Sequence, residues 1–254
     1  MEPLILKNKG QRIFGILHLP EKRKGKAPLV VLCHGWTGNH LGTWNAFFTN
    51  AANDLAKKGY AVFRFDFRGN GNSDGVFEQQ TITSMLSDLE TVVGVLAKRK
   101  EVDDNRIALI GHSQGAYIAL FYATKDNRVK TLISWMGRFS DYKDFASKTW
   151  LEEAERKGFL HFGEGYTIQY DTYIKDSMKY NSRKALRKLK IPLGLLYGEA
   201  DDTVPISEGE KARKETGGKA EIKILKELSH EFTGKPGIQK QTIAITEHWL
   251  KRWL

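Results

Sequence analysis

Short apolar runs recur along this chain, and most are followed by a longer segment whose apolar positions have helical spacing. The runs are nearly continuous, which is typical of strands buried on both faces of a parallel sheet. Strands that alternate with helices predict an α/β fold with a mostly parallel central sheet covered by helices on both faces. The expected strands are Leu4–Lys7, Arg12–Leu19, Leu29–Cys33, Tyr60–Phe65, Arg106–Ile110, Thr131–Trp135, Leu193–Tyr197 and Glu221–Leu225, the first two antiparallel at the sheet edge. The expected helices are Thr43–Lys58, Ile82–Lys98, Ala116–Ala123, Ser207–Thr216 and Ile238–Trp253.

The stretch between Trp135 and Leu193 departs from this alternation of strands and helices, because it has no clear core strand. Within it, residues 137–181 are rich in aromatic and charged side chains. A loop this long inside a compact domain is uncommon and often functional, so we expect a cap inserted over the carboxyl ends of the strands. The alternative is a packing segment that contacts no substrate. The aromatic residues in question are Phe139, Tyr142, Phe145, Trp150, Phe159, Phe162, Tyr166, Tyr170, Tyr173 and Tyr180 together with His161.

Length and composition favour one α/β domain over residues 1–254 that includes this cap. A net charge of +10 could indicate binding to nucleic acid. The basic residues are spread out along the chain, however, so we expect them to lie on the solvated surface. The densest basic groups are residues 22–26, 98–100 and 183–190. No apolar run is long enough to span a membrane and no secretory signal is evident, so we expect a soluble, cytoplasmic protein. Cys33, the one cysteine, lies in an apolar run and is expected to be a core residue. The Lys and Glu content hints at a thermophilic source, and a homodimer is compatible with the sequence.

Gly111-His112-Ser113-Gln114-Gly115 lies between an expected strand and an expected helix. In that context Gly-x-Ser-x-Gly predicts a nucleophile elbow, a tight turn that exposes the serine hydroxyl above the sheet. The glycines allow the turn to form, and the helix N-terminus points N–H groups at developing negative charge. The alternative is a tight strand-to-helix turn with a buried serine.

A serine nucleophile needs a base and an orienting acid, which follow it in the order Ser, Asp or Glu, His when it sits on such an elbow. His230 is the expected base, because it follows the last expected strand on a loop, whereas His161 lies in the cap and His248 in a helix. The acid should follow the preceding strand, where Glu199, Asp201 and Asp202 compete. Spacing from the strand and from Val204-Pro205 favours Asp201.

Two backbone N–H groups should stabilise the tetrahedral intermediate. One belongs to Gln114, the residue after the nucleophile, and the other to the loop His34-Gly35-Trp36-Thr37-Gly38, where Trp36 is the expected donor. His34 is expected to fix this loop and not to act as the base. The Gly-rich loop 66–75 lacks the lysine of a phosphate-binding loop and does not run straight into a helix. We therefore expect a structural loop that braces the loop at Trp36, with Asp66 and Arg68 in local hydrogen bonds. Ser73 has no elbow, and no Cys/His cluster has the spacing of metal ligands, so we expect no metal.

Together these motifs resemble the α/β-hydrolase superfamily from about Leu4 to Leu254. They are His34-Gly35-Trp36-Thr37-Gly38, Asp66-x-Arg68-Gly69-x-Gly71-x-Ser73-x-Gly75, Gly111-His112-Ser113-Gln114-Gly115, Gly198-x-x-Asp201-x-x-Val204-Pro205 and Ser229-His230-Glu231-Phe232. Within the superfamily the chain is similar to small carboxylesterases of the cinnamoyl and feruloyl esterase type. It shares with them the His-Gly-aromatic-Thr-Gly loop, a Gln after the nucleophile and a short aromatic cap.

The resemblance implies a serine carboxylesterase that acts on short- to medium-chain or aromatic esters without a cofactor. The same motifs occur in monoacylglycerol lipases and acylaminoacyl-peptidase-like domains, so a peptidase, amidase, thioesterase or monoacylglycerol lipase using the same residues is an alternative. A non-catalytic binding protein on this fold is a further alternative, because a fold does not fix function. The leading expectation is a small-molecule ester substrate and no nucleic-acid partner.

Overall fold

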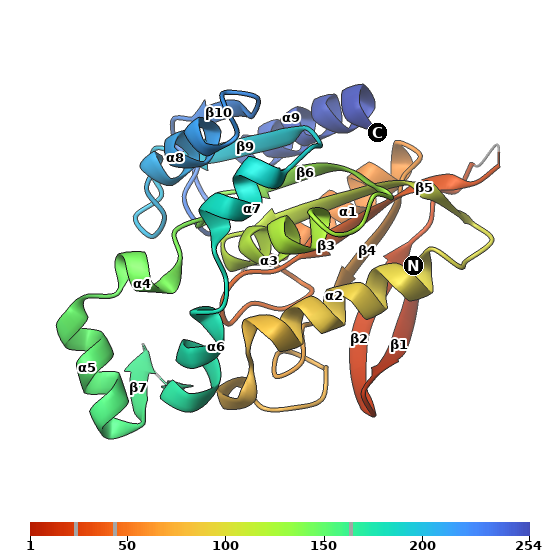
Figure 1. Ribbon diagram of the computed structural model, residues 1–254. Coiled ribbons are helices and arrows are strands. Elements are labelled where there is room, and N and C mark those ends of the chain that lie inside the picture. The colour runs from red at the N-terminus through yellow and green to blue at the C-terminus, as the bar shows by residue number, and fades with distance from the viewer. Residues whose placement is uncertain (23–24, 43–44, 163–164) are drawn as a thin grey trace.

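The computed structural model describes residues 1–22, 25–42, 45–162 and 165–254 of the chain, and the side chains of Phe145 and Phe162 lie outside this description. Within the described part, eight strands form one sheet (Figure 1). In order across the sheet they are β1 (Glu2–Asn8), β2 (Gln11–His18), β4 (Ala61–Phe65), β3 (Ala27–Cys33), β5 (Val102–His112), β6 (Val129–Trp135), β9 (Leu193–Gly198) and β10 (Glu221–Leu225).

The six strands from β4 to β10 run parallel, and only the edge pair differs. β1 is antiparallel to β2, and β2 is antiparallel to β4. The other neighbours pair in parallel, with Leu29 of β3 opposite both Ala61 of β4 and Ile107 of β5. The predicted α/β fold with an antiparallel edge is therefore confirmed.

Helices cover both faces of the sheet. Successive β3 side chains point alternately to opposite faces, so that Val30 belongs to one buried cluster and Val31 to the other. The Val30 side packs against α1 (Phe47–Lys57) and α9 (Ile238–Trp253). The Val31 side packs against α2 (Ile82–Leu96), α3 (Gln114–Ala123), α7 (Ser182–Lys188) and α8 (Ser207–Glu215). Near-continuous apolar strands arise because both faces are buried.

Element ends differ modestly from the expectations. The first helix begins at Phe47, later than expected, and residues 43–44 of the expected span lie outside the described residues. β5 begins at Val102 rather than Arg106, because its first residues pair with Ala27 and Pro28 before a register shift. α3 begins at Gln114, directly after Ser113, so the helix end and the predicted nucleophile are adjacent.

Between β6 and β9 the chain leaves the main sheet. Residues 137–181, called the insertion below, contain α4 (Tyr142–Phe145), α5 (Lys148–Lys157), β7 (Phe159–Phe162), β8 (Tyr166–Gln169), the π-helical turn η2 (Tyr170–Ile174) and α6 (Lys175–Ser177). β7 and β8 pair only with each other, so this segment adds no strand to the core, as expected. In Figure 1 the insertion lies to one side of the main sheet, beside the start of α2. Residues 163–164 of the insertion lie outside the described residues.

Candidate active site

Ser113 lies on a strained turn between β5 and α3. Its backbone has φ 51° and ψ −121°, a conformation that a residue with a side chain rarely adopts. A Cβ atom on Gly111 would overlap the backbone of Ala116, and one on Gly115 would overlap the carbonyl oxygens of Cys33 and His34. The sequence has glycine at both positions because the turn leaves no space for a side chain. Strain of this kind persists only where the surrounding structure fixes it, and it is frequent at functional sites.

The predicted base and acid form a buried pair. Nδ1 of His230 lies 2.8 Å from Oδ2 of Asp201, whose side chain is fully buried. The other carboxylate oxygen, Oδ1, accepts hydrogen bonds from the backbone N–H groups of Thr203 and Val204, both at 2.8 Å. A carboxylate accepts, so Nδ1 of His230 carries the proton and Nε2 is the nitrogen able to receive one. The competing acids, Glu199 and Asp202, are exposed.

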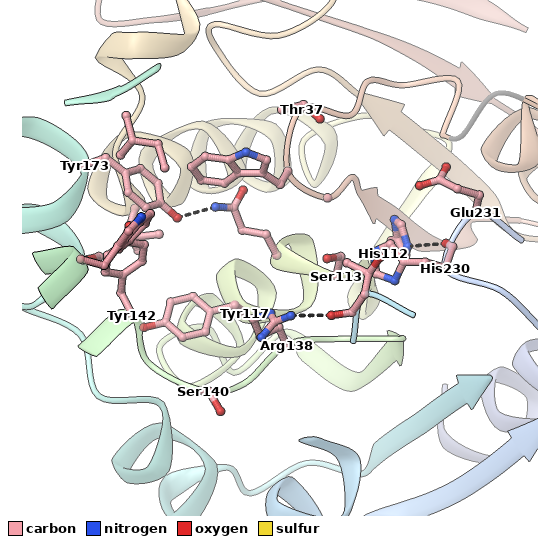
Figure 2. A pocket seen from close by; sticks show the side chains of 18 residues that line it. Thr37, His112, Ser113, Tyr117, Arg138, Ser140, Tyr142, Tyr173, His230 and Glu231 are labelled. Carbon is pink, nitrogen blue, oxygen red and sulfur yellow. Dashed lines mark hydrogen bonds between the residues drawn. The ribbon is translucent and has the colours of Figure 1, made fainter. Parts of the chain in front are cut away.

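Ser113 and His230 line one cavity of about 450 Å³, although they are far apart in sequence (Figure 2). Other walls come from Trp36 after β3, Arg138 after β6 and Thr203 after β9. All of these residues lie beyond the carboxyl ends of parallel strands, where ligands bind in open α/β sheets. The volume lies within the range of small-molecule sites.

The two residues predicted to supply oxyanion N–H groups both belong to segments that adjoin the nucleophile. Gln114 is the first residue of α3, and the first N–H groups of a helix have no acceptor within the helix. Trp36 follows Gly35, and a Cβ on Gly35 would come within 3.0 Å of Cβ of Ser113, so this loop runs directly beside the elbow. Both Trp36 and Gln114 line the cavity.

The loop at Trp36 is braced by His34, as the sequence suggested. Nδ1 of His34 lies 2.8 Å from the carbonyl oxygen of Gly35, and Nε2 accepts a hydrogen bond from the backbone N–H of Phe67 at 3.0 Å. This pattern requires the proton on Nδ1. Burial lowers the pKa of His34, which favours the neutral ring that these two contacts need.

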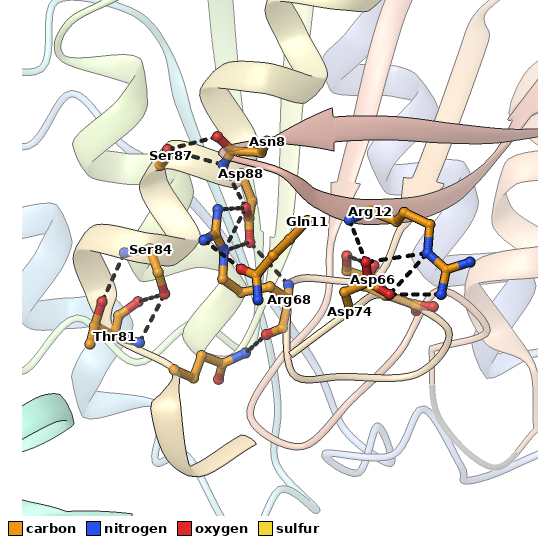
Figure 3. A network of polar contacts seen from close by, with 12 residues as sticks. Asn8, Gln11, Arg12, Asp66, Arg68, Asp74, Thr81, Ser84, Ser87 and Asp88 are labelled. Carbon is orange, nitrogen blue, oxygen red and sulfur yellow. Dashed lines mark hydrogen bonds and ion pairs between the residues drawn. The ribbon is translucent and has the colours of Figure 1, made fainter. Parts of the chain in front are cut away.

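The Gly-rich loop 66–75 is joined by hydrogen bonds and an ion pair to the loop after β3 and to α2. Asp66 accepts from the backbone N–H groups of His40 at 2.5 Å and Asn72 at 2.8 Å. Arg68 pairs with buried Asp88 at 2.5 Å (Figure 3). Ser73 donates its hydroxyl to the Asp66 carbonyl at 2.7 Å and accepts from a backbone N–H, so it is structural. The loop therefore braces the segment after β3 through Asp66, whereas Arg68 binds α2 instead.

His112, within the elbow motif, has a role that the sequence did not indicate. Its Nε2 lies 3.1 Å from the carbonyl oxygen of His230, so it donates there and connects the elbow to the loop of the predicted base. Burial, followed by the neighbouring His230, holds the pKa of His112 well below its ordinary value, and the ring stays neutral. In sequence, His112 is only the variable position of Gly-x-Ser-x-Gly.

The insertion closes the far side of the cavity. Tyr142, Trp150, Ile168 and Tyr173 line it, so part of the aromatic segment faces the predicted nucleophile. Other aromatic residues pack elsewhere: Phe139 is buried, and Tyr166 contacts Phe77. Only part of the aromatic segment therefore lines the cavity.

Among the described residues, no group of three or more His, Cys, Asp or Glu side chains could hold a metal ion. In the same part of the chain, no helix combines the length and apolar character that crossing a bilayer requires. Cys33 is fully buried, and burial raises the pKa of its thiol.

Known proteins resemble this chain in sequence and in structure. The alpha/beta hydrolase fold family matches residues 28–168. An uncharacterised 31.7 kDa protein from the traX-finO intergenic region of Escherichia coli is 33% identical over 135 residues, and the match covers 53% of this chain but only 45% of that protein. The mitochondrial palmitoyl-protein thioesterase ABHD10 of Bos taurus is 27% identical over 232 residues, covering 86% of this chain and 72% of the relative.

Among solved structures, Est1E from Butyrivibrio proteoclasticus with bound ferulic acid superposes with a TM-score of 0.81. The two sequences are 21% identical and the match covers 98% of each chain, which shows a common fold. The family match spans more than half of the chain and includes the elbow. The chain therefore belongs to the alpha/beta hydrolase fold family.

Proposed function

We propose that this protein is a serine hydrolase that cleaves carboxylic esters through an acyl-enzyme on Ser113. The observation that carries the proposal is the Asp201–His230 hydrogen bond in the same cavity as a serine on a strained elbow. Neither the strained serine turn nor the His–Asp pair would suffice alone, because each occurs in structural roles. Their convergence supplies a nucleophile, a base and an orienting acid.

In the proposed reaction, Nε2 of His230 takes the hydroxyl proton of Ser113 as Oγ attacks the ester carbonyl carbon. The carbonyl π-electrons move to oxygen, and the N–H groups of Trp36 and Gln114 stabilise that oxyanion, at about 3–4 kcal/mol per donor. The C–O bond to the alcohol then breaks, and His230 returns the proton to the leaving alcohol. Water, deprotonated by His230, then attacks the acyl carbon. The bond from that carbon to Oγ breaks, His230 gives the proton to Oγ, and the carboxylic acid leaves the regenerated Ser113. Asp201 keeps Nδ1 protonated and stabilises the imidazolium.

The insertion is proposed to act as a cap that shapes the acyl or alcohol pocket. Tyr142, Trp150 and Tyr173 give this side of the cavity flat apolar surfaces, which suit aromatic or short- to medium-chain groups. The likeness to Est1E, solved with ferulic acid, supports an aromatic acyl group as the first candidate. A cytoplasmic location, a thermophilic source and a homodimer stay predictions from the sequence.

Thioester hydrolysis is a second candidate. A palmitoyl-protein thioesterase is similar over most of this chain. The same residues could attack a thioester carbonyl, and the leaving thiol would need less protonation than an alcohol. Whether the substrate is a long-chain thioester or a short or aromatic ester would then depend on the length of acyl chain that the cavity accepts.

The decisive test is hydrolysis of p-nitrophenyl esters from acetate to palmitate, methyl ferulate and a palmitoyl thioester, with Ser113→Ala as the matched control. The ester proposal expects turnover of short or aromatic esters that is lost in the variant, while the urea unfolding transition stays unchanged. A fluorophosphonate probe should label the wild-type protein and not Ser113→Ala. Preference for palmitoyl thioester would favour the second candidate, and equal activity in wild type and variant would reject Ser113 as the nucleophile.

A further inference from the structure

Tyr173 of the insertion contacts the side chains of both residues proposed to form the oxyanion hole. Nε2 of Gln114 donates a hydrogen bond to the Tyr173 hydroxyl at 2.5 Å (Figure 2). The Tyr173 ring packs edge-on against Trp36, with ring centroids 4.8 Å apart and planes at 85°. A single insertion residue therefore connects the loop after β3 with the first residue of α3.

Tyr173 is itself firmly placed. It lies in η2, a π-helical turn, and is 7% exposed. Such turns are rare and are frequent at functional sites. Three residues later, Asp176 accepts hydrogen bonds from the backbone N–H and the hydroxyl of Thr83 at 2.8 and 2.7 Å. The position of Tyr173 is thus fixed against the start of α2 as well as within the insertion.

The loop that carries Trp36 depends on such contacts. It has no regular secondary structure, and Thr37 adopts a positive φ of 54°. A side chain and its own backbone N–H share one Cα, so restraint of the side chain limits where the N–H points. Donors must be placed within fractions of an ångström of the developing oxyanion to be effective.

We propose that Tyr173 is a positioning residue for the oxyanion hole. It restrains Gln114 through its hydroxyl and Trp36 through its ring, so that the two backbone N–H groups converge above Ser113. The inference rests on the proposed function, because it assigns the two N–H groups to an oxyanion. It also means that the insertion helps to build the catalytic machinery in addition to forming a pocket wall. Burial raises the pKa of Tyr173, so the phenol stays neutral over the working pH range.

Tyr173→Phe separates the two contacts, because it removes the hydroxyl and keeps the ring. We expect kcat for p-nitrophenyl acetate to fall about tenfold, the effect of one lost hydrogen bond, while KM stays unchanged. Inhibition by phenylboronic acid, which forms a tetrahedral adduct with a serine, should weaken by the same factor. Gln114→Met keeps the backbone N–H and should reproduce this loss, and the double variant should lose no more than either single variant.

Tyr180→Phe is the matched control. Tyr180 is also in the insertion, and its hydroxyl also contacts a helix of the main domain, in this case Oγ1 of Thr83 in α2 at 2.7 Å, but Tyr180 does not line the cavity. This variant should leave kcat and boronic acid inhibition unchanged. A raised KM with unchanged kcat in Tyr173→Phe would make Tyr173 a substrate-contacting wall residue and overturn the proposal, as would an unchanged kcat or additive losses in the double variant.

The rate of fluorophosphonate labelling makes the inference separable from the ester assignment. Labelling reports on the nucleophile and the oxyanion hole whatever the natural substrate. If no ester is cleaved but Ser113 is labelled, Tyr173→Phe should still be labelled about tenfold more slowly. Equal labelling rates would overturn the inference alone, and absence of labelling in the wild type would overturn both proposals.

Discussion

Two histidine–aspartate pairs in this protein have nearly the same geometry. Nδ1 of His230 lies 2.8 Å from Asp201, and Nδ1 of His40 lies 2.9 Å from Asp66. Both carboxylates are fully buried, and each also accepts two backbone N–H hydrogen bonds. A buried His–Asp hydrogen bond is therefore not diagnostic of catalysis.

The surroundings of the two rings differ. The His230 ring lines the cavity together with Ser113. The His40 ring packs edge-on against Phe14, with centroids 5.0 Å apart, and the His40 carbonyl accepts a hydrogen bond from Arg64 at 2.9 Å. The first pair leaves one ring nitrogen available to the proposed nucleophile, whereas the second stabilises a loop. Asn substitution of each aspartate tests this distinction with the same chemical change.

Asp201→Asn should have the largest effect. The Asn oxygen can still accept from Thr203 and Val204, but its NH₂ then faces Nδ1 of His230. The histidine proton would move to Nε2, the nitrogen that must accept the proton of Ser113. We expect kcat to fall about 10⁴-fold, measured with p-nitrophenyl acetate, with little change in the free energy of unfolding in urea. A loss of less than tenfold would remove Asp201 from its proposed role as the orienting acid.

The sequence predicts the Asp201 pair and the elbow because their geometry restricts residue type. Gly111 and Gly115 have no space for a side chain, and Ser113, Asp201 and His230 follow one another in the chain order expected with such an elbow. The choice of Asp201 over Glu199 and Asp202 rested on spacing, and burial of Asp201 with His230 agrees with it. Local constraints of this kind can be recognised in a single sequence.

The contacts of the insertion could not be predicted from local sequence motifs. Its length and aromatic content predicted a cap but not which side chains face the cavity, because packing across the segment decides that. The Gln114–Tyr173 contact joins residues 59 apart in sequence, and no local motif indicates it. The His40–Asp66 pair was missed for a similar reason: Asp66 was expected to make local hydrogen bonds, but its partner on another loop carries no sequence signal.

Asp66→Asn should affect stability and leave the chemistry largely intact. Asp66 accepts from the backbone and ring of His40 and from the backbone of Asn72. An amide has one acceptor oxygen, so its NH₂ would face at least one of these donors. We expect a loss of about 1–3 kcal/mol in the free energy of unfolding, measured in urea, with kcat within about one order of magnitude of wild type. Complete loss of hydrolysis by the folded variant would place this pair in catalysis and break the distinction.

The smallest expected effect is a loss of folding stability in acid that originates close to the His40–Asp66 pair. Arg64, which donates to the His40 carbonyl, also donates to Nε2 of His18 at 3.0 Å. Burial and the Arg64 charge lower the pKa of His18 from 6.5 to about 4, so the folded protein needs a neutral ring there. The unfolded chain binds this proton more readily, and stability should therefore be lost as the pH falls from about 6.5 towards 4.

His18→Gln should reduce that pH dependence without abolishing it, because buried His34 and His112 also have lowered pKa values. Urea unfolding at pH 7.5 and 5.5 measures the difference between the two conditions for each variant. His248→Gln, an exposed histidine of α9, is the matched control and should retain the wild-type difference. If His18→Gln also retained the wild-type difference, the acid sensitivity would not originate at His18 beside Arg64.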